Sequence, residues 1–229
     1  MAIKRALHDP TVSPTTVFEE KVMKVKLEFT TTLLGATPKD PDIYTNFIAS
    51  KAPDAETAAQ EIARVGVTEA VDSKTSGFLL DDDGSPALKE HVVKGFFQSA
   101  CKSIRRINGS KQKYESGKLS AYKEKIKDLI FIYPRYIPLI PPADADEDQI
   151  LATLQRPLRA ETAQGERIAL ASSETMPEGT TMEFEIHLMD EQLEPAVREW
   201  LDYGRYKGMG EWRNAGHGRF EWMEITDEA

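Results

Sequence analysis

The 229-residue chain contains one cysteine and four histidines. A single thiol excludes a disulfide framework and a cysteine-based zinc site within one chain. No apolar run approaches the roughly 20 residues that a membrane helix needs, and residues 1–20 lack the apolar centre of a signal peptide. We therefore expect a soluble, cytoplasmic protein with no membrane partner, in which Cys101 is buried and unreactive.

The signature motifs of common enzymes are missing as well. There is no P-loop, no G-x-S-x-G and no H-E-x-x-H, and metal-ligand spacing is absent from His8, His91, His187 and His217. The three aspartates at 81–83 precede Gly84 but lack the spaced ligands and closing glutamate of a calcium loop. A turn explains them better, so we expect no metal and no cofactor.

Positive charge is scarce overall but concentrated in one segment. The net charge is −9, yet residues 102–127 hold nine Lys or Arg against Glu115 and Glu124, a local balance of +7. An acidic body argues against a protein that coats nucleic acid non-specifically. The segment is either a solvated helix-loop-helix face or a binding surface, with Arg105, Arg106, Lys111 and Lys113 as candidate contacts.

The stretch from Trp200 to Trp222 combines glycines, aromatics and cations. Gly204 is followed by four candidate backbone-approach positions, Gly208, Gly210, Gly216 and Gly218, and the candidate cations are Arg205, Lys207, Arg213 and Arg219. Glycine lets another backbone or a ligand approach closely, which suits a polyanion lying across the loop. The aromatics Tyr203, Tyr206, Trp212 and Tyr133 are candidates for stacking on bases, whereas Trp200, Trp212 and Trp222 are equally explained as core.

Strands are predicted where apolar residues alternate or β-prone residues cluster. The predicted ranges are 22–34, 75–80 closed by a turn at 81–84, 129–140 as an edge strand or a kinked strand because of its prolines, 156–160, 167–176, 180–189 and 219–225. The turn tetrapeptide Met176–Gly179 predicts that 167–176 and 180–189 form a hairpin.

Helices are predicted between these strands, and together they define a fold class. The predicted ranges are 42–50, 54–65, a long helix from Pro86 to Ile107, a short helix within 108–127, and 191–203 with Gly204 at its C-cap. The order predicts an α+β fold with a ferredoxin-like or RRM-type antiparallel sheet, built as one modified or two tandem β-α-β halves, ending in a glycine-rich loop. Residues 1–20 are expected to form an arm and 21–229 one domain, with possible halves 21–143 and 144–229.

Two motifs resemble the RAMP superfamily, the RNA-binding proteins of CRISPR effector complexes. The strand entered through Gly216-His217-Gly218-Arg219-Phe220 is similar to the C-terminal glycine-rich loop of that family. The segment from Asp82 to Ala100, with the pair Lys94-Gly95, looks like the opening of the first long helix in backbone subunits. The resemblance implies RNA contacts at Lys94, Gly95 and the loop.

Three functions follow as hypotheses. The first is a non-catalytic RAMP-like protein that binds single-stranded, guide-type RNA or docks on a ribonucleoprotein, as a homo-oligomer or a subunit of a hetero-assembly. The alternative is a phage-type assembly protein or an inhibitor of a defence complex, acting in the host cytoplasm.

The third hypothesis is a metal-independent endoribonuclease with His217 as general base. The family resemblance places the catalytic histidine elsewhere, and it also implies target cleavage by an aspartate after the first strand, where Asp40 and Asp42 lie. Helix capping explains those two aspartates equally well.

Overall fold

The computed structural model describes residues 19–39, 75–81, 83–162 and 165–226, and a four-stranded antiparallel sheet lies at its centre. Its strand order is β12-β1-β11-β7, in which the strands are β1 (Lys21–Phe29), β7 (Ile130–Tyr133), β11 (Thr181–Leu188) and β12 (Phe220–Glu224). The chain visits this sheet in the order β1, helix, β7, β11, helix, β12. The α+β class predicted from the sequence is therefore confirmed.

Alternation along the two central strands separates the faces of the sheet. In β1, Met23, Val25, Leu27 and Phe29 are all fully buried, and the residues between them point to the other face. The predicted strand 22–34 is shorter than expected. It ends at Phe29, and Leu33–Leu34 forms β2, which joins another sheet.

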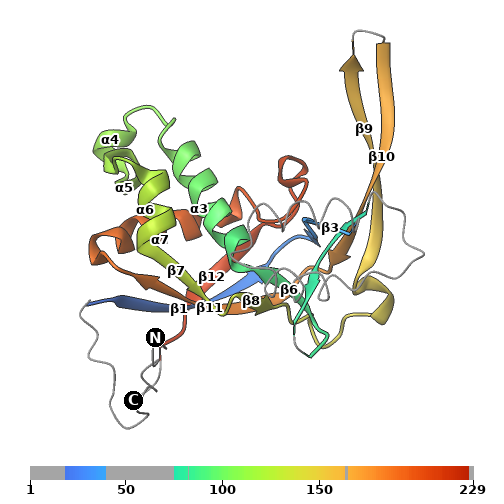
Figure 1. The fold of residues 1–229 in the computed structure, drawn as a ribbon, viewed down its shortest axis with the longest axis horizontal. Helices are drawn as coiled ribbons and strands as arrows, with labels where there is room; N and C mark the ends of the chain where they lie inside the picture. Colours follow the sequence, from blue (N-terminus) through green and yellow to red (C-terminus); the bar gives the residue numbers. More distant parts are fainter. Residues whose placement is uncertain (1–18, 40–74, 82, 163–164, 227–229) are drawn as a thin grey trace, which may run out of the picture.

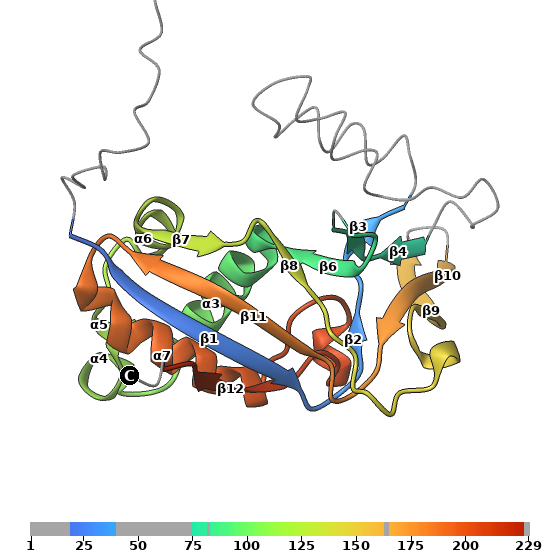
Figure 2. The same cartoon turned by 90° about the horizontal axis from the view of Figure 1, so that it is seen from below.

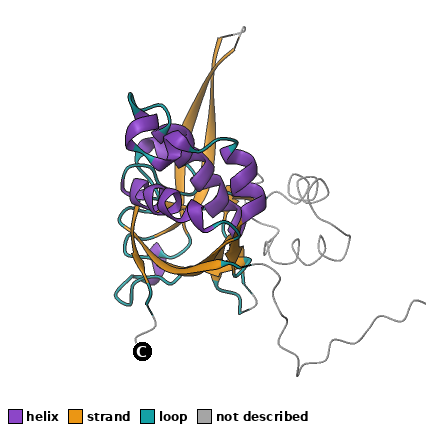
Figure 3. Cartoon of the chain, turned by 90° about the vertical axis from the view of Figure 1, so that its left-hand side faces the viewer, coloured by secondary structure: helices purple, strands orange, loops and turns teal. Residues whose placement is uncertain are grey.

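Helices cover one face of this sheet (Figure 3). They are α3 (Glu90–Ile104), α4 (Ser110–Lys113), α5 (Glu115–Lys118), α6 (Tyr122–Leu129) and α7 (Glu194–Asp202). Aromatic rings join the layers: Phe96 of α3 meets Phe220 of β12 at 5.1 Å between centroids, and Phe97 meets Trp200 of α7 at 5.4 Å. The other face of β1 and β11 is turned toward the viewer in Figure 2.

Two further sheets flank the central one. The five-stranded sheet contains β2, β3 (Thr37–Pro38), β4 (Thr75–Gly77), β9 (Ala152–Thr162) and β10 (Gly165–Met176). The three-stranded sheet contains β5 (Leu79–Leu80), β6 (Pro86–Lys89) and β8 (Tyr136–Pro138). Strands β9 and β10 form a long two-stranded ribbon that projects from the body (Figure 1).

The predicted hairpin of 167–176 with 180–189 is wrong in its pairing. The turn exists, with Gly179 at a φ of +83° and Thr180 Oγ1 donating to the Pro177 carbonyl at 2.7 Å. However, β10 pairs with β9, whereas β11 pairs with β1 and β7. The turn thus carries the chain from one sheet into another, which local turn chemistry cannot reveal.

Two helix boundaries also differ from the predictions. Pro86 lies in β6, which pairs with β5 and β8, and α3 begins only at Glu90. Gly204 is not a C-cap residue: the chain continues from α7 through a 3₁₀ turn at Tyr203–Arg205, and Gly204 packs inside it against Phe220. The predicted β-turn at 81–84 is confirmed, because β5 and β6 pair across it.

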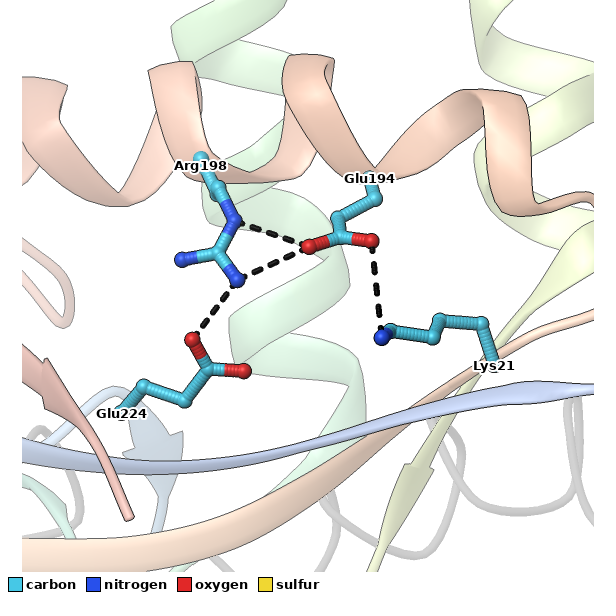
Figure 4. A network of polar contacts seen from close by, with 4 residues as sticks. All are labelled: Lys21, Glu194, Arg198 and Glu224. Carbon is cyan, nitrogen blue, oxygen red and sulfur yellow. Dashed lines mark hydrogen bonds and ion pairs between the residues drawn. The ribbon is translucent and has the colours of Figure 1, made fainter. Parts of the chain in front are cut away.

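A polar network holds α7 against the sheet (Figure 4). Arg198 donates to Glu194 on the same helix at 2.8 Å and to Glu224 of β12 at 2.6 Å, and Glu194 also lies 3.9 Å from Lys21 of β1. The hydrogen bond to Glu224 is the largest of the effects that raise the pKa of Arg198. Helix α7 is therefore anchored to both β1 and β12, directly before the C-terminal loop begins.

Several predictions fall on residues that the structure does not describe. The helices expected at 42–50 and 54–65, the aspartates Asp40 and Asp42, and the arm up to residue 18 lie outside the described residues. Among the helices that the structure does describe, none is long and apolar enough to cross a membrane.

Candidate nucleic-acid interface

The loop between α7 and β12 is held by its own backbone. Met209 N–H donates to the Gly218 carbonyl at 2.8 Å, and Gly218 N–H donates to the Thr32 carbonyl at 3.0 Å. Thr31 Oγ1 donates to the Gly216 carbonyl and accepts from Arg219 N–H. These hydrogen bonds satisfy backbone groups of the loop and fix the loop against the segment that follows β1. The side chains of the loop therefore project from a preformed surface.

Close packing within the protein accounts for glycine at three of the loop positions. A Cβ on Gly208 would lie 2.1 Å from the Gly218 backbone, and one on Gly218 would lie 2.0 Å from the Met209 carbonyl. Gly210 has a φ of +74° and would bring its Cβ within 2.3 Å of the Leu34 carbonyl. These contacts are intramolecular, so glycine is needed here for the loop to close on itself.

Gly216 differs from these three. Its φ is +94°, but a Cβ there would meet only the Arg219 guanidinium, at 3.5 Å. Positive φ is the constraint at this position, and the neighbouring guanidinium can move.

Four cations from two distant segments meet beside this loop. We name Lys102, Arg106, Lys207 and Arg213 the cation group. Burial lowers the pKa of Lys207, and the positive charges of Arg213, Arg106 and Lys102 lower it further. Within the described residues, none of the four forms an ion pair with a carboxylate. The group is thus a site of uncompensated positive charge, and bound anions would relieve its repulsion.

Two predicted contacts, Lys94 and Arg105, serve the fold. Lys94 Nζ donates to the Lys127 carbonyl at 3.3 Å and lies 5.0 Å from the Phe131 ring centroid, and burial lowers its pKa. Arg105 donates to the carbonyls of Ser116 (3.0 Å) and Leu119. Both cations therefore tie α3 to the segment that follows it.

The basic segment is docked on α7 through one carboxylate. Glu199 accepts from the backbone N–H groups of Glu115 and Ser116, both at 2.9 Å, and from the Ser116 hydroxyl. Trp200 Nε1 donates to the same hydroxyl at 2.8 Å. Lys111 and Lys113 lie on α4 and are exposed.

Aromatic rings flank the cation group, in different states. Tyr206 is 68% exposed and lies 6.0 Å from the Tyr203 ring. Trp212 stacks on His217 with centroids 5.1 Å apart and an 18° interplanar angle, and the Arg156 guanidinium lies 5.2 Å from the same indole. Tyr206 is therefore available to a base, while Trp212 is already stacked. Trp200 is fully buried and belongs to the core.

Arg156, in β9, has a role that sequence reasoning missed. It is 7% exposed and donates to Glu211 Oε2 at 2.6 Å and Ser173 Oγ at 2.9 Å. Glu211 is thereby neutralised, so the loop keeps its positive balance. A buried arginine on a strand carries no local sequence signal, because its carboxylate partner lies far along the chain.

The remaining predicted residues are placed at or near this surface. Arg205 and Arg219 are exposed on the loop, and Gly95 is exposed on α3 with open space beyond it. Lys102 belongs to the basic segment at 102–127 but is not among the contacts predicted from the sequence. Its proximity to Lys207 depends on the tertiary fold.

Comparisons with known proteins give little beyond the arrangement of the chain. No family model and no curated protein matches. A chain of a Type IV-B CRISPR complex matches with a TM-score of 0.46 and 10% identity, covering 91% of this chain and 92% of its own. A chain in the cryo-EM structure of the Type III-B Cmr-beta bound to cognate target RNA matches with a TM-score of 0.45 and 13% identity over 90% of this chain. This chain spans 60% of that one. At these scores, neither likeness supports a functional conclusion.

Proposed function

We propose that the chain is a non-catalytic, RAMP-like RNA-binding protein that holds single-stranded RNA against the cation group. The observation that carries this proposal is the meeting of four cations with no carboxylate paired to them among the described residues. Phosphate groups of a single strand are the partners that such a group fits, because they are spaced along a flexible chain and each accepts one cation.

The surroundings of the cation group support a single strand over a duplex. The exposed Tyr206 ring adjoins Lys207, and unstacked bases lie readily on such rings. Arg205 and Arg219 extend the positive surface along the loop. The fixed backbone of the loop means that little ordering entropy is lost when RNA binds.

The strand order supports the ferredoxin-like part of the proposal. A β-α-β-β-α-β unit with the order β12-β1-β11-β7 has the topology of that motif, with β1 and β11 in the middle. In this assignment α3 and α7 are its two helices. Docking on a ribonucleoprotein as one subunit of an assembly is part of the same proposal.

The test is a fluorescence-anisotropy titration with a single-stranded oligoribonucleotide at several salt concentrations. Four phosphate contacts predict a slope of about −2.8 in log K against log salt, or about a fifty-fold loss between roughly 50 and 200 mM. Lys207→Ala with Arg213→Ala should halve the slope. The matched control, Lys24→Ala with Lys26→Ala on the sheet, removes equal charge and should leave the slope unchanged. Absence of binding at low salt would refute the proposal.

The non-catalytic part needs its own test. Labelled RNA is incubated in EDTA with the wild type and with His217→Ala. Because His217 stacks on Trp212, we expect no specific scission by either protein. Cleavage that the substitution abolishes would establish the ribonuclease alternative instead.

A further inference from the structure

Exposed apolar side chains lie on the face of the four-stranded sheet opposite to the described helices. Of the eight large hydrophobic residues that are exposed among the described residues, five lie on this face, namely Val22, Phe131, Tyr133, Ile140 and Met223, at 37% to 56% exposure. Strand alternation and the bridge from Ile140 to Thr181 place them together. We call this surface the open face. Exposed apolar residues that share one face make that face a candidate interaction site.

The register orders the charges of the open face in rows across the strands. One row reads Tyr133, Glu185, Lys24, Ile225, as β7 pairs with β11, β11 with β1, and Ile225 N–H donates to the Lys24 carbonyl at 2.8 Å. This row thus runs from an apolar residue through an acid and a base to a second apolar residue. The next row repeats the acid and base with Glu183, Lys26 and Met223.

A hollow lies over the first row. Its volume is about 460 Å³, and Lys24, Tyr133, Glu185 and Ile225 are among the residues that line it. A side chain from a facing surface could enter it, so the open face offers shape as well as charge.

We propose that the open face binds the open face of a second copy of this chain, about a twofold axis parallel to the strands between β1 and β11. Such an axis reverses every row. Lys24 then faces the partner's Glu185, Lys26 faces the partner's Glu183, and Tyr133 faces the partner's Ile225. A twofold interface must be self-complementary, and these rows meet that condition. Two sheets packed face to face lie about 10 Å apart, a distance that these side chains can fill.

The charges of the open face favour this occupant over RNA. Glu28, Glu183, Glu185 and Glu221 outnumber Lys24 and Lys26 on the face, so phosphates would be repelled. A second copy places an acid opposite each of these two bases, while Glu28 and Glu221 lie in a separate row that contains no base. The proposal does not rest on the function proposed above, since the cation group lies on other elements.

The decisive experiment uses two charge reversals in the full chain, measured by sedimentation equilibrium. The wild type should sediment as two chains. Lys26→Glu and Glu183→Lys should each be monomeric, since each homodimer would oppose like charges twice. Mixing the two variants should restore the dimer, because Glu at position 26 then meets Lys at position 183 of the other chain. The pair within one chain, at 3.0 Å, cannot explain rescue by mixing.

The matched control is Lys118→Glu, which breaks the exposed ion pair of Lys118 with Glu115 on α5 and should leave the dimer intact. Circular dichroism confirms that each variant is folded. A wild type of one-chain mass, a dimer insensitive to Lys26→Glu, or a mixture that stays monomeric would each overturn the proposal. RNA that protects Tyr133 from modification would do the same, by giving the face another occupant.

Discussion

The cation group and the open face both carry charge beside exposed aromatic rings, yet the chain builds them in opposite ways. The cation group joins the end of α3 to a loop about a hundred residues later, and the charges that act on Lys207 are all positive. The open face alternates acid and base by strand, and Lys26 already pairs with Glu183. An external anion would relieve the repulsion within the cation group, whereas the two acid-base rows, Glu185 with Lys24 and Glu183 with Lys26, are complementary to a second copy of the same face.

Reversing charge in the cation group should have the largest effect. Lys207→Glu with Arg213→Glu replaces two attractions for phosphate by two repulsions, so RNA affinity at low salt should fall by more than about a hundredfold. The same reversal on the open face, Lys24→Glu with Lys26→Glu, should change RNA affinity less than about threefold. Anisotropy titrations of both doubles measure the contrast. Equal losses would erase the distinction between the two surfaces.

Adding a methyl group to the loop should separate fold from ligand. Gly218→Ala puts a Cβ against the Met209 carbonyl at a φ of +68°, so unfolding free energy should fall by at least about 1 to 3 kcal/mol. Gly95→Ala is the matched substitution: it meets open space on α3 and should raise stability by up to about 1 kcal/mol. Urea denaturation gives both values. A Gly218→Ala protein of unchanged stability would show that the loop is less tightly packed than the contacts indicate.

Removing the exposed ring beside the cation group should have a moderate effect. Tyr206→Ala should weaken RNA binding by about 1 to 3 kcal/mol if one base stacks there, with the salt slope unchanged. Tyr133→Ala, on the open face, should leave RNA affinity unaltered and weaken self-association. An altered slope for Tyr206→Ala would mean that the loop itself had moved.

The smallest effect concerns α3, which carries Lys102 and ends at Ile104, two residues before Arg106. Burial raises the pKa of Cys101 on α3 to about 11 from an ordinary value of 9.0. The unfolded chain therefore loses the thiol proton first, and this contribution to stability is complete below pH 9 and lost as pH rises toward 11. Cys101→Ala should remove that pH dependence, which denaturation at pH 8 to about 11 would detect. Rapid alkylation of native Cys101 at neutral pH would contradict its burial.

The sequence pattern predicted the positions of most strands of the central sheet, but it did not predict which strands pair with one another. Alternation located β1 and β11. The range 129–140, predicted as an edge or a kinked strand, is divided between β7, at the edge of the central sheet, and β8 of another sheet. The turn at Met176–Gly179 was recognised, yet its strands joined different sheets, because pairing is decided by partners distant in sequence. The division into halves stays a prediction, and membership of the RAMP superfamily belongs to the proposed function.

The candidate site was less predictable, for a physical reason. A count of charges identified the basic segment, but it could not tell that Arg105 donates to the carbonyls of Ser116 and Leu119 while the charge of Arg106 helps to lower the pKa of Lys207. Both arginines are exposed and follow Ile104, the last residue of α3, so their different contacts depend on the tertiary fold. The glycine-rich sequence suggested that a ligand could approach the loop backbone closely. In the structure, the backbones of Gly208 and Gly218 instead pack closely against each other.

The position of β1 has a consequence for how the chain acquires its structure. Residues 21–28 pair with 181–188 on one side, and 25–29 pair with 220–224 on the other. During synthesis β1 therefore cannot pair until β11 and β12 have been made. Until then the sheet that buries Met23, Val25, Leu27 and Phe29 is incomplete. Such long-range pairing slows folding and prolongs exposure to aggregation. We expect nascent chains that stop before β11 to need a chaperone, although every α-helix that the structure describes except α7 precedes β11 in the sequence.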